Sequence, residues 1–405
     1  MWKQYKRILN IAKTDALQSF LPIILWYIVG YIYQDRDLSN IFSLTYYFQF
    51  VYAIVYDVIL VGTVKCTKKN KDVNLDAPYS AVITGALIMI SIVIGIGFNT
   101  DAVLRYFNAS SKYKYFYILA LIYLSTDYVM CGISKILQYS EKHDDAFKIT
   151  VAYHSIRIGS VFIAKIAKDI IDKNNYIVSL AVAGTCVLTF ALYSIIKYCR
   201  IHKFVFNCFK GVFIESPSIV YGIMMTVIYF FGLQKAAVGS ASFLAAYNIS
   251  TMCTDTQWDI LHCSIDTNTS VQLCDGSFEK NKKDIYKASM LYSLTLFFSS
   301  FVLIMICSIG ATFDLKAALL MYLIECITFI WYSVMYVQQS WLKLFYSGKF
   351  MVLQVIVGYT VRVILTFSIN SMYRLNIPVF INSIFMFVTT LIMYKYYRKQ
   401  RRREV

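Results

Sequence analysis

The chain has 405 residues, of which 58% are hydrophobic and only 15% are charged, and its formal net charge is +16. A soluble protein of this size needs more charge to cover its surface, so the apolar excess must face lipid, and the four prolines and sixteen glycines exclude collagen-like and disordered chains. The basic residues lie in short loops between apolar runs, so they indicate the positive-inside bias of a membrane protein and no nucleic-acid partner.

In chain order, twelve apolar segments are predicted to cross the bilayer: 16–34, 40–64, 79–98, 115–138, 147–170, 176–197, 212–233, 240–266, 286–310, 315–338, 350–370 and 377–395. Most are near the ~20 residues that cross a ~30 Å hydrocarbon core as a helix. The runs are long and do not alternate with a period of two, which favours helices over a barrel of strands. The expected fold is an all-α membrane protein with twelve transmembrane helices.

The distribution of Lys and Arg predicts the orientation of these segments. With a cytoplasmic N-terminus, 27 of them fall at inside positions and 10 in outside loops. This bias predicts an N-in and C-in, multi-pass protein of the cytoplasmic membrane. A basic cluster follows the last segment: Lys395, Arg398, Lys399, Arg401, Arg402 and Arg403. Its simplest interpretation is a cytoplasmic stop, and contact with anionic lipid is a second one.

The basic loop Lys197–Lys210 divides the chain near its middle, which predicts two six-helix lobes, residues 1–200 and 201–405. When the two halves are aligned, Asp57 of the second segment falls on Asp259 of the eighth, and a basic loop follows each of these segments. Lobes related by an axis along the membrane normal place a substrate between them, near the midplane.

Signatures of enzymes and metal sites are missing from the sequence. The ten cysteines form no CxxC pair, and the four histidines do not cluster. No GxSxG, HExxH or Gly-rich phosphate loop is present. The basic segment 1–15 is not followed by a short apolar run with a cleavage site, so no cleaved signal peptide is expected. The chain is therefore predicted to be no enzyme, with neither a metal nor an organic cofactor.

A set of loose motifs lies between Glu215 and Leu296: Pro217, Gly232-Leu233, the small-residue run Leu244–Ile249 and the charged turn Gly276–Lys283. These motifs resemble the opening of the second half of a multidrug and toxic compound extrusion (MATE) transporter, in the multidrug/oligosaccharidyl-lipid/polysaccharide flippase superfamily. The resemblance implies two six-helix lobes and alternating access.

Two departures from the family concern ion coupling. Family members often carry an acid midway along the first helix, whereas the run Ile23–Tyr33 has none, and Asp35 and Asp37 lie at its outer end. The acid that the family places early in the seventh helix falls near Met224 and Met225. The resemblance therefore does not transfer a coupling ion.

The eighth segment holds the strongest candidate site. Six polar residues spaced by three or four positions lie on one helical face: Asn248, Thr251, Asp255, Asp259, His262 and Asp266. Such charges cannot face lipid. One interpretation is a proton or cation path in which Asp255, Asp259 and His262 couple to the ion while Asn248 and Thr251 line the substrate cavity. The other is a polar face that bonds to neighbouring helices, with Asp266 at a wet cytoplasmic end.

Other segments also contain charged side chains. Asp57 and Asp127 are further candidates for cation coupling. Arg157 either neutralises Asp127 or binds an anionic substrate. Glu325 and Arg362 either pair with each other or contact the substrate in the cavity.

The chain is rich in tyrosine, and Tyr31 and Tyr47 are candidates for holding an aromatic or cationic substrate. The resulting hypothesis is a secondary active transporter that exports a small organic or cationic compound in exchange for protons or sodium ions. An alternative is a flippase for lipid-linked oligosaccharide or polysaccharide. It would need a strongly cationic cavity, for which Arg157 and Arg362 are the obvious candidates.

Overall fold

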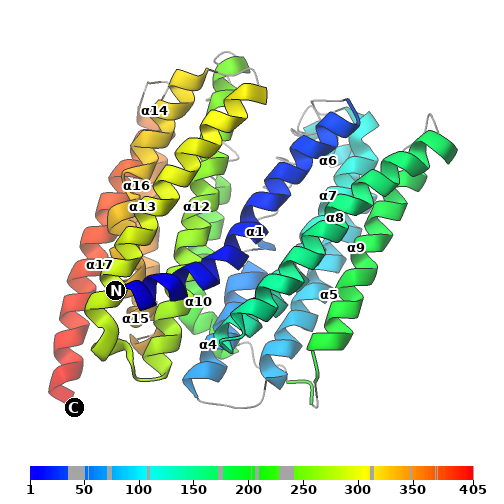
Figure 1. Ribbon diagram of the computed structural model, residues 1–405. Helices are drawn as coiled ribbons and strands as arrows, with labels where there is room; N and C mark the ends of the chain where they lie inside the picture. Colours follow the sequence, from blue (N-terminus) through cyan, green and yellow to red (C-terminus); the bar gives the residue numbers. More distant parts are fainter. Residues whose placement is uncertain are drawn as a thin grey trace. The chain divides into compact units, whose positions relative to one another are not determined.

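Figure 1 shows the computed structural model, which describes residues 1–34, 51–52, 54–70, 75–106, 110–171, 177–201, 203–205, 209–227, 241–310, 314–346, 349–369, 371 and 373–404. Within these residues every regular element is a helix, which confirms the all-α prediction. Eight stretches of the described chain are long and apolar enough to cross a membrane, so the protein is a multi-pass membrane protein.

The chain divides into two compact units, one of Ala16–Val212 and the other of Met1–Asp15 together with Phe213–Val405. The predicted lobes, 1–200 and 201–405, differ from these units at both boundaries. The difference at the N-terminus arises because the start of the first helix, Met1–Asp15, belongs to the second unit.

The first unit is built from the second half of α1 and the helices that follow it: α1 (Trp2–Ile32), η2 (Ile54–Val61), α4 (Gly62–Lys69), α5 (Asp76–Phe98), α6 (Thr100–Tyr106), η3 (Ser111–Tyr113), α7 (Lys114–Tyr139), α8 (His143–Ile171) and α9 (Ile177–Tyr198). Helix α7 packs against α5, α8 and α9. Its membrane-spanning window is 72% buried, against 28% for α5, so α7 is the central helix of this unit.

The second unit holds the remaining helices: α10 (Phe209–Val227), α12 (Ala241–Cys274), α13 (Phe278–Gly310), α14 (Leu315–Cys326), α15 (Phe329–Tyr346), α16 (Lys349–Ser368) and α17 (Asn376–Glu404). Helix α12 packs against α13, α14 and α15, and α17 packs against α14, α15 and α16. A tight turn joins α12 to α13. Gly276 sits in it with a φ of 74°, a conformation that glycine adopts without a steric cost.

The segment Met1–Asp15 is the beginning of α1, and it belongs to the second unit although the rest of α1 belongs to the first. Its polar side chains bond to the buried polar face of α12: the Gln272 amide donates to Gln4 at 2.7 Å, and the Ser264 hydroxyl donates to Asp15 at 3.0 Å. These partners attach the start of α1 to the second unit.

The predicted segment 315–338 is two helices, because α14 ends at Cys326 and α15 begins at Phe329. Thr328 donates to the carbonyl of Glu325 through its backbone amide at 3.2 Å and through its hydroxyl at 2.5 Å. These short-range bonds replace the regular helical pattern at the break, so the backbone remains satisfied without water.

Helices α5 and α7 approach each other closely at Gly85. A methyl group added at Gly85 would overlap the ring and hydroxyl of Tyr128, which is fully buried and donates to the carbonyl of Ala81 at 3.0 Å. The absence of a side chain at this position is therefore what allows the tyrosine to lie across α5.

We predict that Gly85→Ala lowers the free energy of unfolding by roughly 1–3 kcal/mol, the usual cost of forcing extra atoms into a packed interior. Thermal unfolding of the purified protein in detergent measures it. The control is Gly95→Ala on the same helix, where nothing lies within 4 Å of the added carbon. This control should be neutral or slightly stabilising, because alanine favours a helix. Equal melting temperatures for the two variants would contradict the close approach.

Candidate functional site

Helix α12 carries the predicted polar stripe on one continuous helix, but its members differ in burial. Asp255 and His262 are half-buried, Asp259 is exposed and Asp266 is buried. Thr251 is half-buried. The side chain of Asn248 lies outside what the structure describes. The polar stripe is therefore partly accessible from Asp255 to His262 and buried at Asp266.

The prediction that Asp266 is a wet residue at a helix end is wrong. Its carboxylate is buried, and it accepts a hydrogen bond of 2.5 Å from the hydroxyl of Ser340 on α15. Asp266 thus joins two helices of one bundle, as the second interpretation of the stripe expects for this residue.

Glu325 forms the centre of a buried polar cluster that involves three helices. Its carboxylate, on α14, is 3% exposed. One oxygen accepts from the hydroxyl of Thr254 on α12 at 2.8 Å, and the other accepts from the amide of Asn376 at the start of α17 at 2.6 Å. Asp255 follows Thr254 directly in the sequence, so α12 carries a second carboxylate next to the residue that bonds to Glu325.

The pairing of Glu325 with Arg362, one of the two sequence interpretations, is not formed among the described residues, where Thr254 and Asn376 occupy the two carboxylate oxygens. Arg362 is buried on α16, and its guanidinium lies 5.6 Å from the ring centre of Tyr359. It remains in electrostatic range of Glu325, so it adds positive charge near the cluster without a direct bond to that residue.

Aromatic side chains surround the acidic face of α12. The His262 and Tyr336 rings lie 4.9 Å apart, Tyr336 stacks on Tyr332 at 5.5 Å, and Trp258 lies 5.8 Å from Tyr332. Electron-rich ring faces attract organic cations. The acids and the rings together form a surface that suits a cationic or aromatic compound.

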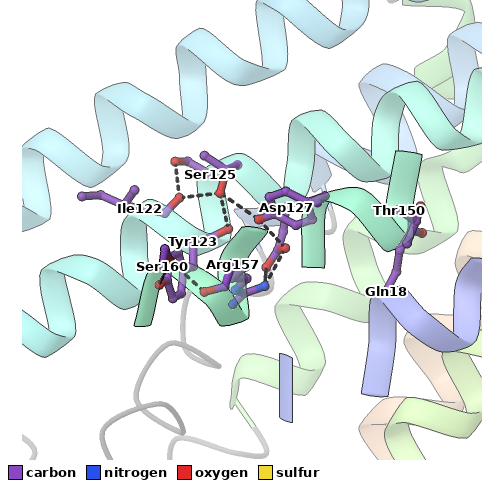
Figure 2. A network of polar contacts seen from close by, with 10 residues as sticks. Gln18, Ile122, Tyr123, Ser125, Asp127, Thr150, Arg157 and Ser160 are labelled. Atoms are coloured by element: carbon purple, nitrogen blue, oxygen red, sulfur yellow. Dashed lines mark hydrogen bonds and ion pairs between the residues drawn. The ribbon is translucent and has the colours of Figure 1, made fainter. Parts of the chain in front are cut away.

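In the first unit, Arg157 neutralises Asp127, as one of the two sequence interpretations expects (Figure 2). The guanidinium is 1% exposed and donates to both carboxylate oxygens, at 2.8 and 2.9 Å. The hydroxyl of Tyr153 also donates to Asp127 at 2.8 Å, and the guanidinium lies 4.4 Å from the ring centre of Tyr123. A carboxylate with these partners is a stable structural centre, and Arg157 is engaged by protein groups.

The structure contains a second buried ion pair, which the sequence did not predict. Lys343 on α15 donates to Glu215 on α10 at 2.8 Å, and their side chains are only 5% and 2% exposed. No spacing rule reveals this pair, because 128 residues separate its members. The only sequence signal is a lone acid, Glu215, at the start of an apolar segment.

The other candidates do not join these clusters through any contact that we describe. Asp57 lies half-buried in the π-helical turn η2. Tyr31, near the end of α1, is 87% exposed. Tyr47 lies outside the described residues.

Comparison with known proteins identifies the fold through solved structures. No family model and no curated protein matches the chain, but solved structures match it over nearly their full length. A MATE protein in complex with MaD3S is 12% identical, with 98% of this chain and 97% of that one covered and a TM-score of 0.67. A mutant of the Vibrio cholerae MATE transporter VcmN is 10% identical, with 98% of each covered and a TM-score of 0.69.

The chain has the MATE fold. A transporter of the wider superfamily from Pyrococcus furiosus also matches, at 12% identity and a TM-score of 0.69 over 98% of this chain and 96% of that one. The name of that structure reports a binding pocket of reverse polarity and suggests a different function.

We predict that Asp127→Asn lowers the free energy of unfolding by about 3 kcal/mol or more, because it leaves the Arg157 guanidinium buried without its counter-charge. The double variant Asp127→Asn with Arg157→Met should be more stable than Asp127→Asn alone, since no buried charge remains. Chemical unfolding in detergent micelles measures both.

The control for this prediction is Lys165→Gln, which removes a cation from the exposed pair of Lys165 and Asp169 on the same helix as Arg157. It should cost less than about 1 kcal/mol. Equal losses of unfolding free energy for Lys165→Gln and Asp127→Asn would show that the buried pair stabilises the protein no more than the exposed pair does.

Proposed function

We propose that the chain is a secondary active transporter that moves a small organic or cationic compound across the cytoplasmic membrane in exchange for protons or sodium ions. The single observation that carries this proposal is the MATE fold, matched over 98% of the chain. Two compact units suit alternating access, in which a central site opens to one side of the membrane at a time.

The coupling ion would act at the second unit. Glu325 is a buried carboxylate whose hydrogen bonds come from the neutral donors Thr254 and Asn376. A proton or a sodium ion bound there would offset its negative charge. Because Glu325 bonds to α12 and α17 through Thr254 and Asn376, a change in its charge alters the bonds that hold these two helices. Ion binding and helix position are thereby coupled.

The substrate would meet the open part of the α12 stripe. Asp259 is exposed there, and the ring of His262 is in contact with Tyr336. A carboxylate attracts a cation over distance, and the aromatic rings hold its apolar body. These two features together favour an organic cation as cargo.

A flippase for lipid-linked oligosaccharide is the alternative, and it needs cationic side chains to hold a pyrophosphate group. Arg157 is already engaged by Asp127, so it supplies little net charge to such a site. Arg362 lies in electrostatic range of Glu325. The described residues therefore favour the exporter of organic cations.

We predict that Glu325→Gln and Asp259→Asn reduce gradient-driven transport to the level of protein-free vesicles. Purified protein in proteoliposomes is supplied with a panel of fluorescent organic cations under imposed proton and sodium gradients. Glu325→Gln removes the charge that the coupling ion balances, and Asp259→Asn removes the charge that attracts the cargo.

The matched control is Asp275→Asn, which removes an exposed acid just beyond the end of α12 and should transport normally. Normal transport by Glu325→Gln and Asp259→Asn would refute these roles. If the native protein moves no cation under either gradient, the exporter is refuted, and lipid-linked glycans become the cargo to test.

A further inference from the structure

The second unit contains a cavity of about 540 Å³ between α13, α15 and α17, which lie side by side (Figure 1). It lies away from the Glu325 cluster, near the basic end of α17. Four basic side chains and two tyrosines line most of it: Lys282, Tyr286, Tyr394, Lys395, Arg398 and Lys399. Nothing in the proposed transport mechanism uses this cavity.

The charge of the cavity is strongly positive. Among its four bases, Arg398 is paired with an acid, Glu279, at 2.6 Å. Lys282 and Arg398 also flank the ring of Tyr394, at 5.2 and 5.8 Å from its centre. Cations gathered in this way repel one another, so an anion in the cavity would stabilise their arrangement.

Gln338, on α15, also lines the cavity and is only 4% exposed. The cavity therefore offers basic side chains from α13 and α17 to an anion, beside a neutral polar side chain of α15.

An apolar surface continues from the cavity along the membrane-spanning part of α13. Tyr286, Met290 and Leu294 follow Lys282 at intervals of four residues, so they form one ridge inclined to the helix axis. Met290 and Leu294 are exposed large hydrophobic side chains. A free phosphate uses only the basic end of such a surface, whereas a phospholipid uses both parts.

We propose that this cavity binds the headgroup of an anionic phospholipid, with the phosphate among the lysines and the acyl chains along the α13 ridge. This inference is independent of the cargo and of the coupling ion. It assigns the basic end of α17 a specific ligand in addition to its general role in orientation.

Native mass spectrometry of the full-length protein in detergent tests the proposal, with phosphatidylglycerol as the probe and phosphatidylcholine and glycerol 3-phosphate as comparison ligands. The test variant is Lys395→Gln with Lys399→Gln, because both side chains line the cavity and are exposed, so their loss leaves the fold intact. The control is Lys283→Gln with Lys287→Gln, which removes the same charge from exposed positions outside the cavity.

Phosphatidylglycerol should bind the native protein more tightly than either comparison ligand. Its affinity should fall about tenfold or more in the test variant, since each basic side chain near a lipid phosphate contributes ~1 kcal/mol. The control should change by less than about twofold, because neither of its side chains lines the cavity. Equal losses in both variants, equal binding of the two lipids, or equally tight binding of glycerol 3-phosphate would each overturn the proposal.

Discussion

The exclusion of water from the hydrocarbon core governs the arrangement of charge in both units. A charged side chain on a membrane-spanning helix must find its partners within its own bundle, because lipid offers none. Arg157 meets this demand with Asp127, and Lys343 meets it with Glu215, each at 2.8 Å. These two pairs fix the helices that carry them, because separating either pair exposes a bare charge to an apolar surrounding.

Glu325 satisfies the same constraint in a different way. Its hydrogen bonds in the described chain come from the neutral donors Thr254 and Asn376, so its charge is solvated but not cancelled by a direct ion pair. That difference distinguishes Glu325, which can change its ionic state, from Asp127, which is held in an ion pair. We therefore propose that the first unit carries a structural ion pair and that the second unit carries the carboxylate that responds to the coupling ion.

Much of the fold could be predicted from the sequence, because the length and composition of apolar runs are local properties. Each of the twelve predicted segments overlaps at least one described helix, with much of 40–64 outside the described residues and 315–338 divided between two helices. The spacing of polar residues placed the α12 stripe on one helix. The site was less predictable. Thr254 and Asn376 reach Glu325 from 71 and 51 residues away, and no pattern along the chain encodes such distances. The break after α14 also escaped prediction, because no proline or glycine marks it.

The lengths of α12 and α13 have a practical consequence. They contain 34 and 33 residues, so at ~1.5 Å per residue each is about 50 Å long, well beyond the ~30 Å hydrocarbon core. The excess lies at the turn around Gly276, where the end of α12 is polar and the start of α13 is charged. A stiff hairpin of this kind is a rigid epitope. An antibody fragment against its tip, or a domain inserted at that turn, would be held in a fixed orientation, which is the landmark that image alignment needs for a small membrane protein.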